Sequence, residues 1–209
     1  MTFYALVLNR FIACTCCIII TLFFMFIISI IVCISPSSVK FHVTDASLTQ
    51  FNLTSNNTLY YNLKVNVTVR NPNKHTIVYY RRITVISWYK DNAFGWVSLT
   101  PFDQGHKNTT FLQAVFEGQR VIKLKSKQLG EYKDETSVGI YKDLAVDFDL
   151  RIRAKYGKFK SSRFNTPIVQ CRRLRVPLIS NGKSVPPFSV TRCKSASFFS
   201  DRDAPDVDG

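Results

Sequence analysis

The stretch Tyr60-Tyr-Asn-Leu-Lys-Val-Asn-Val-Thr-Val-Arg70 decides the fold class, because its apolar and polar residues alternate without interruption. One face carries Tyr61, Leu63, Val65, Val67 and Val69, and the other carries Tyr60, Asn62, Lys64, Asn66, Thr68 and Arg70. A period of two with β-branched residues on the apolar face predicts a strand with one buried and one solvent-exposed face. Asn71-Pro72-Asn73 ends the strand, because proline has no amide donor for a ladder and asparagine accepts turn conformations.

Similar short runs predict further strands along the rest of the chain. They cover residues 77–80, 83–89, 94–99, 109–116, 121–124, 145–156 and 159–164, with a hairpin turn at Gly157-Lys158. In residues 128–141 a helical turn and a long loop are both compatible with the sequence. The chain has no heptads and no βαβ spacing. We therefore expect an all-β fold, a single antiparallel β-sandwich of the immunoglobulin or fibronectin-III kind, over residues 41–194.

The run 11–34 contains no charged residue and is rich in Ile, Phe, Leu and Val. A helix of this length spans about 36 Å, enough to cross a hydrocarbon core of about 30 Å. We expect a transmembrane helix that contacts membrane lipid, with a short cytosolic segment before it (1–10) and a linker after it (35–40). A cleaved signal peptide is the alternative, but its apolar region is usually about 7 to 15 residues long, and no Ala-x-Ala-like site follows.

Glycosylation sequons and cysteines predict that the chain beyond this run faces an oxidising compartment. Asn-x-Ser/Thr sequons occur on the same side of the run, at Asn52, Asn56, Asn66 and Asn108. The cysteines outside the run are Cys171 and Cys193, an even pair that can form one disulfide. Cys14, Cys16 and Cys17, near the expected cytosolic end of the run, are open either to S-acylation or to a role as small apolar residues.

The chain is strongly basic, with a formal net charge of +14, and part of that charge is concentrated near one predicted hairpin. The residues concerned are Arg151, Arg153, Lys155, Lys158, Lys160 and Arg163, with aromatic residues between them. In the cytosol this pattern would suggest nucleic acid, but outside the membrane we expect no nucleic acid partner. Acidic cell-wall polysaccharide, anionic head groups or an acidic protein are the available polyanions. A merely solvated hairpin is the alternative, and Arg172, Arg173 and Arg175 could extend the cluster.

No catalytic or metal-binding pattern is present in the sequence. The histidines, His42, His75 and His106, are far apart and belong to no His-Glu-x-x-His motif. There is no glycine-rich phosphate loop and no nucleophile elbow. We therefore expect a protein that is not an enzyme and that has no cofactor and no metal.

Several separated motifs resemble a known family. They are Phe41-His-Val-Thr-Asp-Ala-Ser-Leu-Thr-Gln-Phe51, Val69-Arg-Asn-Pro-Asn-Lys74, Tyr79-Tyr80 and Pro101-Phe-Asp-Gln-Gly-His-Lys-Asn-Thr-Thr110. In this order they resemble the plant family related to the non-race-specific disease resistance and harpin-induced proteins, whose members carry one membrane helix and a late-embryogenesis-abundant group 2 domain. The resemblance covers nearly the whole chain and includes a cysteine pair placed like Cys171 and Cys193.

The resemblance implies a single-pass, type II plasma-membrane protein whose domain in the apoplast acts in plant defence. The implied role is in the hypersensitive response or in adhesion between membrane and cell wall, with cell-wall polysaccharide or defence-related membrane proteins as partners. A structural role in abiotic stress is the alternative. The family-motif turns, Asn71, Pro72 and Asn73 with Gln104, Gly105, His106 and Lys107, are candidate site residues, although turn geometry alone explains them equally well. Residues 195–209 are expected to form a flexible acidic tail.

Overall fold

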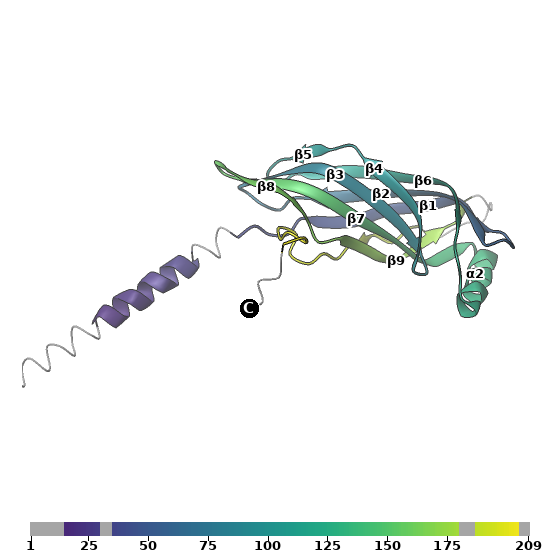
Figure 1. Ribbon diagram of the computed structural model, residues 1–209, viewed down its shortest axis with the longest axis horizontal. Coiled ribbons are helices and arrows are strands. Elements are labelled where there is room, and N and C mark those ends of the chain that lie inside the picture. Colours follow the sequence, from purple (N-terminus) through teal and green to yellow (C-terminus); the bar gives the residue numbers. More distant parts are fainter. Residues whose placement is uncertain (1–14, 30–34, 180–186, 205–209) are drawn as a thin grey trace, which may run out of the picture. The chain divides into compact units, whose positions relative to one another are not determined.

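The computed structural model describes residues 15–29, 35–179 and 187–204, and its folded part is built from antiparallel strands (Figure 1). The prediction of an all-β fold is confirmed. The chain separates into two compact units, Met1–Ser37 and Ser38–Gly209. In the first unit residues 15–29 are helical, and their side chains are exposed. None of the described helices is both long and apolar enough to cross a membrane; the predicted span 11–34 also includes residues 11–14 and 30–34, which lie outside the described part.

The first sheet has the strand order β10-β1-β2-β6. Its strands are β1 (Lys40–Leu53), β2 (Thr58–Arg70), β6 (Thr109–Val121) and β10 (Thr191–Arg192). In β2 the alternation of the sequence is reproduced, because the side chains from Tyr61 to Val69 on the apolar face are buried and those between them are exposed or half-buried. The strand predicted at 60–70 is therefore confirmed, and it lies in the middle of the sheet between β1 and β6.

The second sheet is built around two long strands, β3 (Thr76–Tyr89) and β7 (Ile140–Tyr156). Its other strands are β4 (Asn92–Leu99), β5 (Phe102–Gln104), β8 (Phe159–Asn165) and β9 (Val169–Pro177). Strand β3 pairs with one edge of β7, while the other edge is shared: β8 pairs with its residues 151–156 and β9 with its residues 140–148. This division places β8 and β9 at different ends of β7.

Several predicted boundaries need correction. The runs 77–80 and 83–89 are one strand, β3, with a register shift between Tyr80 and Arg82. The separate strand predicted at 121–124 is wrong, because Val121 ends β6 and Ile122 is buried with its amide donating to Asn57 O, 2.9 Å away, outside the ladder. In the contested segment 128–141 the structure has a helix, α2 (Ser126–Val138). It ends at Gly139, whose φ of 79° suits glycine.

The two sheets enclose one hydrophobic core, to which both contribute buried residues such as Leu48, Val65, Val85 and Phe148. Aromatic rings gather at the end nearest α2, where Phe51 of β1 contacts Tyr89, Phe94, Tyr132 and Tyr141 at centroid distances of 4.6–6.4 Å. Tyr132 belongs to α2, so the helix contributes a ring to the same core. Burial of large apolar side chains of this kind supplies most of the favourable free energy of folding.

The packed domain is longer than the sequence suggested. Residues 195–209 were expected to be a flexible tail, but Phe198 is fully buried and its ring centroid lies 6.0 Å from that of Phe41. The Arg202 amide donates to Asn165 O, 2.8 Å away, so the segment after Phe198 is attached to the end of β8. The prediction of a flexible tail is therefore wrong for residues 195–204, while 205–209 lie outside the described part. At the N-terminal end of the domain Val39, which was predicted to lie in the linker 35–40, is also buried.

Candidate functional site

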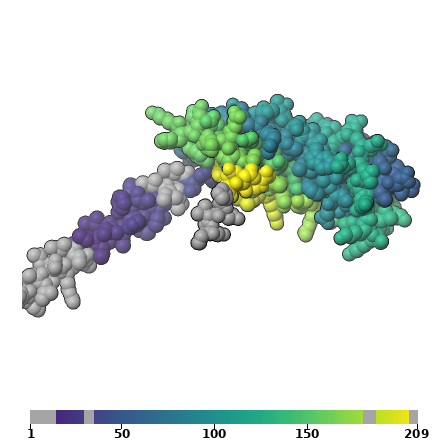
Figure 2. Space-filling model, viewed as in Figure 1, coloured from purple at the N-terminus to yellow at the C-terminus, as the bar shows by residue number. Residues whose placement is uncertain are grey.

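The β7–β8 hairpin brings together the six basic residues singled out in the sequence: Arg151, Arg153, Lys155, Lys158, Lys160 and Arg163. We call this set the hairpin surface. Arg153 lies directly opposite Arg163, and Lys155 lies directly opposite Lys160. Side chains opposite one another in an antiparallel pair share a face, with Cβ atoms about 4.5–5.5 Å apart. Figure 2 shows this hairpin, in bright green, at one end of the folded domain.

The charges of the hairpin surface are not neutralised by the protein. Within the described residues none of its six side chains forms an ion pair with a carboxylate. Arg151, Lys158, Lys160 and Arg163 are exposed, and Arg153 and Lys155 are half-buried. Like charges directly opposite one another on a sheet are destabilising by up to about 1 kcal/mol. An external anion would relieve that repulsion.

Two further contacts shape the hairpin surface. Arg153 Nε donates a hydrogen bond to Ser161 O, 2.8 Å away, which holds its guanidinium beside β8. The turn contains Gly157 at a φ of 57°, a conformation that glycine adopts without strain. Phe159, the first residue of β8, is 79% exposed and lies directly opposite Tyr156, so its side chain is on the other face of the strand from that of Lys160.

The residues beside Cys171 do not extend the hairpin surface, which corrects that expectation. Arg172 lies in β9, which pairs with the first half of β7, and its guanidinium is 3.0 Å from the Asp147 carboxylate. Asp149 follows on β7 and pairs with Arg202 at 3.1 Å. Burial raises the pKa of Asp147, and the nearby Arg172 opposes that shift. These two carboxylates stand between the hairpin surface and the basic residues of β9.

The family-motif turns are joined to each other by hydrogen bonds. Asn71 is fully buried, and its Nδ2 donates to Thr76 O and Gly105 O at 2.7 and 2.9 Å. The amide of Lys107 donates to Asn73 O, 3.0 Å away. These bonds hold the turn after β2 against the turn after β5.

Gln104 also stabilises these turns through hydrogen bonds inside the protein. It is fully buried, its Nε2 donates to Val69 O at 2.7 Å, and its Oε1 accepts from the Tyr80 hydroxyl at 3.2 Å. The amide groups of Asn71 and Gln104 are thus occupied inside the protein. Of the remaining turn residues, His106 and Lys107 are exposed, whereas Pro72, Asn73 and Gly105 are half-buried. The turns stabilise the end of the sandwich and present no convergent site.

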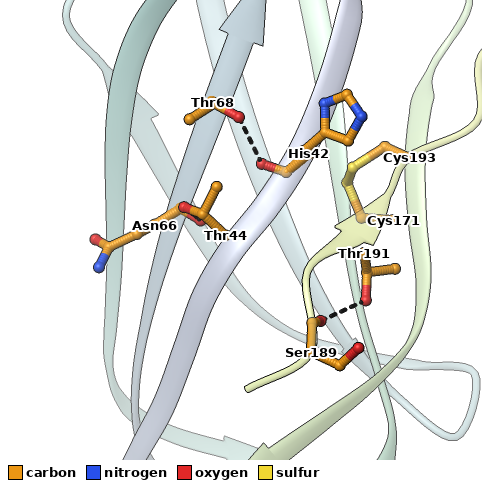
Figure 3. The surroundings of a disulfide bond; sticks show 8 residues. All are labelled: His42, Thr44, Asn66, Thr68, Cys171, Ser189, Thr191 and Cys193. Carbon is orange, nitrogen blue, oxygen red and sulfur yellow. Dashed lines mark hydrogen bonds between the residues drawn. A yellow bond between two sulfur atoms is a disulfide. The ribbon is translucent and has the colours of Figure 1, made fainter. Parts of the chain in front are cut away.

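The predicted disulfide between Cys171 and Cys193 is present, with a Cα–Cα distance of 4.2 Å, and both residues are buried (Figure 3). It joins β9 of the second sheet to the residue after β10. Because the Cys193 amide donates to Phe41 O, 3.0 Å away in β1, the disulfide links the edges of the two sheets. Sequence reasoning did not single out Arg192 and Lys194, which flank Cys193; the signal was available, because pairing with Cys171 brings them beside Arg172.

The sequon asparagines all belong to the first sheet or to loops next to it. Asn52 lies in β1, Asn56 in the turn after it, Asn66 in β2 and Asn108 just before β6. Asn52, Asn56 and Asn108 are exposed. Asn66 is half-buried, and its side chain donates to Asp45 Oδ2 at 3.2 Å and accepts from Gln113 at 2.9 Å. Glycosylation at these positions stays a prediction.

The described residues contain no group of three or more His, Cys, Asp or Glu side chains that could hold a metal ion.

Comparison with known proteins gives the family. A family model described as late embryogenesis abundant protein matches residues 66–170. NDR1/HIN1-like protein 10 of Arabidopsis thaliana is 43% identical over 182 residues, covering 81% of this chain and 79% of that protein. The chain belongs to this late-embryogenesis-abundant family of NDR1/HIN1-like proteins. NDR1/HIN1-like protein 3 of the same plant is 42% identical, covering 76% of this chain and 68% of its own length. NDR1/HIN1-like protein 2 is 38% identical, with coverages of 71% and 61%. The resemblance deduced from the motifs is thus confirmed.

Proposed function

We propose that this NDR1/HIN1-like protein is a single-pass, type II plasma-membrane protein whose β-sandwich acts in the apoplast, in plant defence, without catalysing a reaction. Its sandwich binds acidic cell-wall polysaccharide through the hairpin surface and so attaches membrane to wall. The observation that carries this proposal is the set of six cations on one hairpin with no carboxylate partner among the described residues.

The proposed topology is supported by three features of the chain. The charge-free run 11–34 is long enough to span a bilayer, and part of it, 15–29, is helical. The sequons all follow this run. A disulfide between Cys171 and Cys193 fits an oxidising compartment, because reducing systems keep cytosolic thiols free. A domain in that compartment meets carboxylated polysaccharide rather than nucleic acid.

A polymer with repeated carboxylates suits the hairpin surface better than a single small anion. Exposed lysine and arginine side chains form weak individual contacts that salt screens. Several such contacts on one chain reinforce one another, because each contact after the first is intramolecular. The cross-strand pairs Arg153–Arg163 and Lys155–Lys160 offer rows of positive charge for this purpose. Binding should therefore weaken steeply as the salt concentration rises.

Retention on immobilised polygalacturonate tests the proposed ligand. The full chain in detergent should elute at high salt, and the variant Lys158→Gln/Lys160→Gln/Arg163→Gln should elute at clearly lower salt. Lys123→Gln/Lys127→Gln/Lys133→Gln is the matched control, because it removes the same charge from exposed positions at and near α2. Circular dichroism checks the fold of each variant. Equal elution of the two triple variants would remove the hairpin surface from the proposal.

A separate experiment tests the proposed topology. Glycosidase treatment of the protein from plant membranes should increase its electrophoretic mobility, because glycans at the sequons would be removed. Alkaline carbonate should leave the protein in the membrane pellet, since it releases only peripheral proteins. An unshifted band or a released protein would contradict a glycosylated, membrane-anchored exterior domain.

A structural role in abiotic stress is the second candidate, and the description of the matching family model as a late embryogenesis abundant protein favours it. In that case the domain would protect the membrane surface, and its transcript would rise in drought but not during infection. Induction by pathogen with loss of wall attachment in the hairpin variant would support the defence role instead.

A further inference from the structure

A cavity of about 700 Å³ lies beside the disulfide, away from the hairpin surface. Its lining comes from the ends of β3 and β7, from β9 and from the segment around β10. The β7 residues that line it are Asp143 and Ala145, whereas the hairpin surface begins at Arg151 of the same strand. At about 3.3 Å per residue the two regions are about 20 Å apart along the strand. A cavity of this volume is within the range of pockets that hold small molecules.

Three basic residues of the cavity, Arg173, Arg192 and Lys194, lie close in sequence to the two cysteines of the disulfide, and we call them the cationic wall. Arg173 follows Cys171 by two positions, and Arg192 and Lys194 flank Cys193. The backbones of Gln170 and Lys194 are joined by two hydrogen bonds of 2.7 Å, which align the two segments. Arg173, Arg192 and Lys194 are exposed and form no ion pair in the described part of the chain. Three positive charges are therefore available to a ligand.

Two other cations at the cavity are already occupied. Arg172 pairs with Asp147 at 3.0 Å and lies over the Trp88 ring, 5.9 Å from its centroid. Lys90 Nζ is 2.5 Å from the carboxylate of Glu131 and 3.5 Å from that of Glu135, both on α2. Because Arg172 and Lys90 are already paired with carboxylates of the protein, we assign the binding of a ligand anion to the other cations of the cavity.

Apart from Gln170, the remainder of the lining is acidic or apolar. Asp91, in the turn after β3, and Asp143, near the start of β7, supply carboxylates, while Trp88 and Ala145 supply apolar surface. A bare anion such as phosphate would gain only from the cations and would be repelled by the carboxylates. A sugar acid carries a carboxylate for the cations, hydroxyl donors for the carboxylates and an apolar face for the indole. This combination of groups is complementary to the whole lining.

We propose that the cavity binds the end of an acidic oligosaccharide, a uronate whose carboxylate contacts Arg173, Arg192 and Lys194. Its hydroxyl groups donate to Asp91 and Asp143, and its ring lies beside Trp88. The inference rests on the proposed function, because it takes the exterior compartment and acidic polysaccharide from it. It adds a second site with a different specificity: the hairpin surface holds the length of a polymer, and the cavity recognises a short fragment or a chain end.

The test uses trigalacturonate, which is too short to bridge to the hairpin surface, and isothermal titration calorimetry of the full chain in detergent. The parent protein should bind the trimer. In Arg173→Asn/Arg192→Gln/Lys194→Gln the Kd should rise about tenfold or more, because charge-assisted contacts to the carboxylate are lost. Asn replaces Arg173 because that position has a φ of 58°, which asparagine tolerates. The variant Lys123→Gln/Lys127→Gln/Lys133→Gln is the matched control, because it removes the same charge from exposed positions outside both the cavity and the hairpin surface, and it should bind the trimer as the parent does.

Three results would overturn the inference: no binding of the trimer by the parent, equal binding by the cavity variant, or inorganic phosphate binding as tightly as the trimer and displacing it. Neutral maltotriose should not bind, and its binding at equal strength would also contradict the role of the carboxylate. Failure of the proposed function gives a different result, an unchanged elution of the hairpin variant from polygalacturonate. The two hypotheses are therefore separable with the same set of proteins.

The disulfide offers a second test, since it holds the two segments that carry the wall. The variant Cys171→Ser/Cys193→Ser should bind trigalacturonate more weakly while keeping its retention on polygalacturonate. Trimer binding at parental strength in this variant would contradict a wall assembled by the disulfide. Retention on the polymer shows in the same experiment that the hairpin remains folded.

Discussion

Two regions lie at opposite ends of the domain, the α2 end and the β7–β8 hairpin (Figure 1). They differ in whether their basic side chains are buried and paired with carboxylates. At the α2 end Lys90 is buried, with 3% of its side chain exposed, and pairs with Glu131 and Glu135. On the hairpin Lys160 and Arg163 are exposed and have no carboxylate partner among the described residues. A buried charge must be paired, because its desolvation costs several kcal/mol, whereas an exposed one need not be.

The comparison separates structural charge from available charge. The α2 end uses its lysine, carboxylates and tyrosines to attach a helix to the core: the Tyr89 hydroxyl donates to Glu135 Oε2, 2.7 Å away, and Tyr132 OH accepts from the Leu53 amide at 2.8 Å. The hairpin leaves its charge to solvent and to a ligand. Mutations at the α2 end should therefore change stability, and mutations in the hairpin should change binding.

The largest effect is expected for Glu135→Leu. It removes a buried carboxylate partner of Lys90 and the acceptor of the Tyr89 hydroxyl, so the free energy of unfolding should fall by about 3 kcal/mol. Urea unfolding followed by tryptophan fluorescence measures the loss. The double variant Lys90→Met/Glu135→Leu should recover part of it, because the buried lysine, which keeps only the part-exposed Glu131 as a partner in the single variant, is then replaced by an apolar side chain. A single variant within about 0.5 kcal/mol of the parent would mean that the network is not structural.

The next effect is a loss of stability at high pH. Burial raises the pKa of Tyr141 to about 12, and the hydrogen bond to Thr136 opposes that shift. Burial also raises the pKa values of Tyr80 and Tyr89. A tyrosine whose pKa is higher in the folded state than in the unfolded one holds its proton better when folded. Its contribution is complete below about pH 10 and is lost as the pH rises towards about 12.

For Tyr141 alone this loss is on the order of 2–3 kcal/mol at about pH 12. Urea unfolding at a series of pH values should show the decline, and Tyr141→Phe should make it shallower, because phenylalanine does not ionise. A stability that stays constant from about pH 9 to about pH 12 would show that the buried tyrosines ionise without unfolding.

The smallest effect on stability is expected in the hairpin. Lys158→Gln/Lys160→Gln/Arg163→Gln should change the free energy of unfolding by no more than about 0.5 kcal/mol, or raise it slightly, because like charges across β7 and β8 are removed. The same urea assay measures this change. A loss of more than about 1.5 kcal/mol would show that the hairpin cations are structural, like Lys90, and would erase the difference between the two regions.

Strand β2 could be predicted because alternation is a local property. The pairing of Cys171 with Cys193 could be predicted because no other cysteine of the sequence lies outside the apolar run. Strand β1 was not predicted: register shifts between Val43 and Asp45 and between Leu48 and Gln50 interrupt its alternation. Strand β9 is similar, because a shift in its pairing with β7 separates Cys171 from Leu174 and leaves Arg173 at a positive φ. Bulges of this kind remove the periodic signal.

The amino-acid sequence alone was enough to predict the all-β class, the cysteine pair, the concentration of basic residues in the hairpin and the family. The folded structure was needed to see which charges are neutralised and that Phe198 belongs to the core. It was also needed to see that Arg192 and Lys194 line one cavity with Trp88 and Asp143. The difference arises from the separation along the chain between the residues that interact. Periodicity and residue type act between neighbours in sequence, whereas pairing, burial and the walls of a cavity depend on contacts between strands that are distant along the chain.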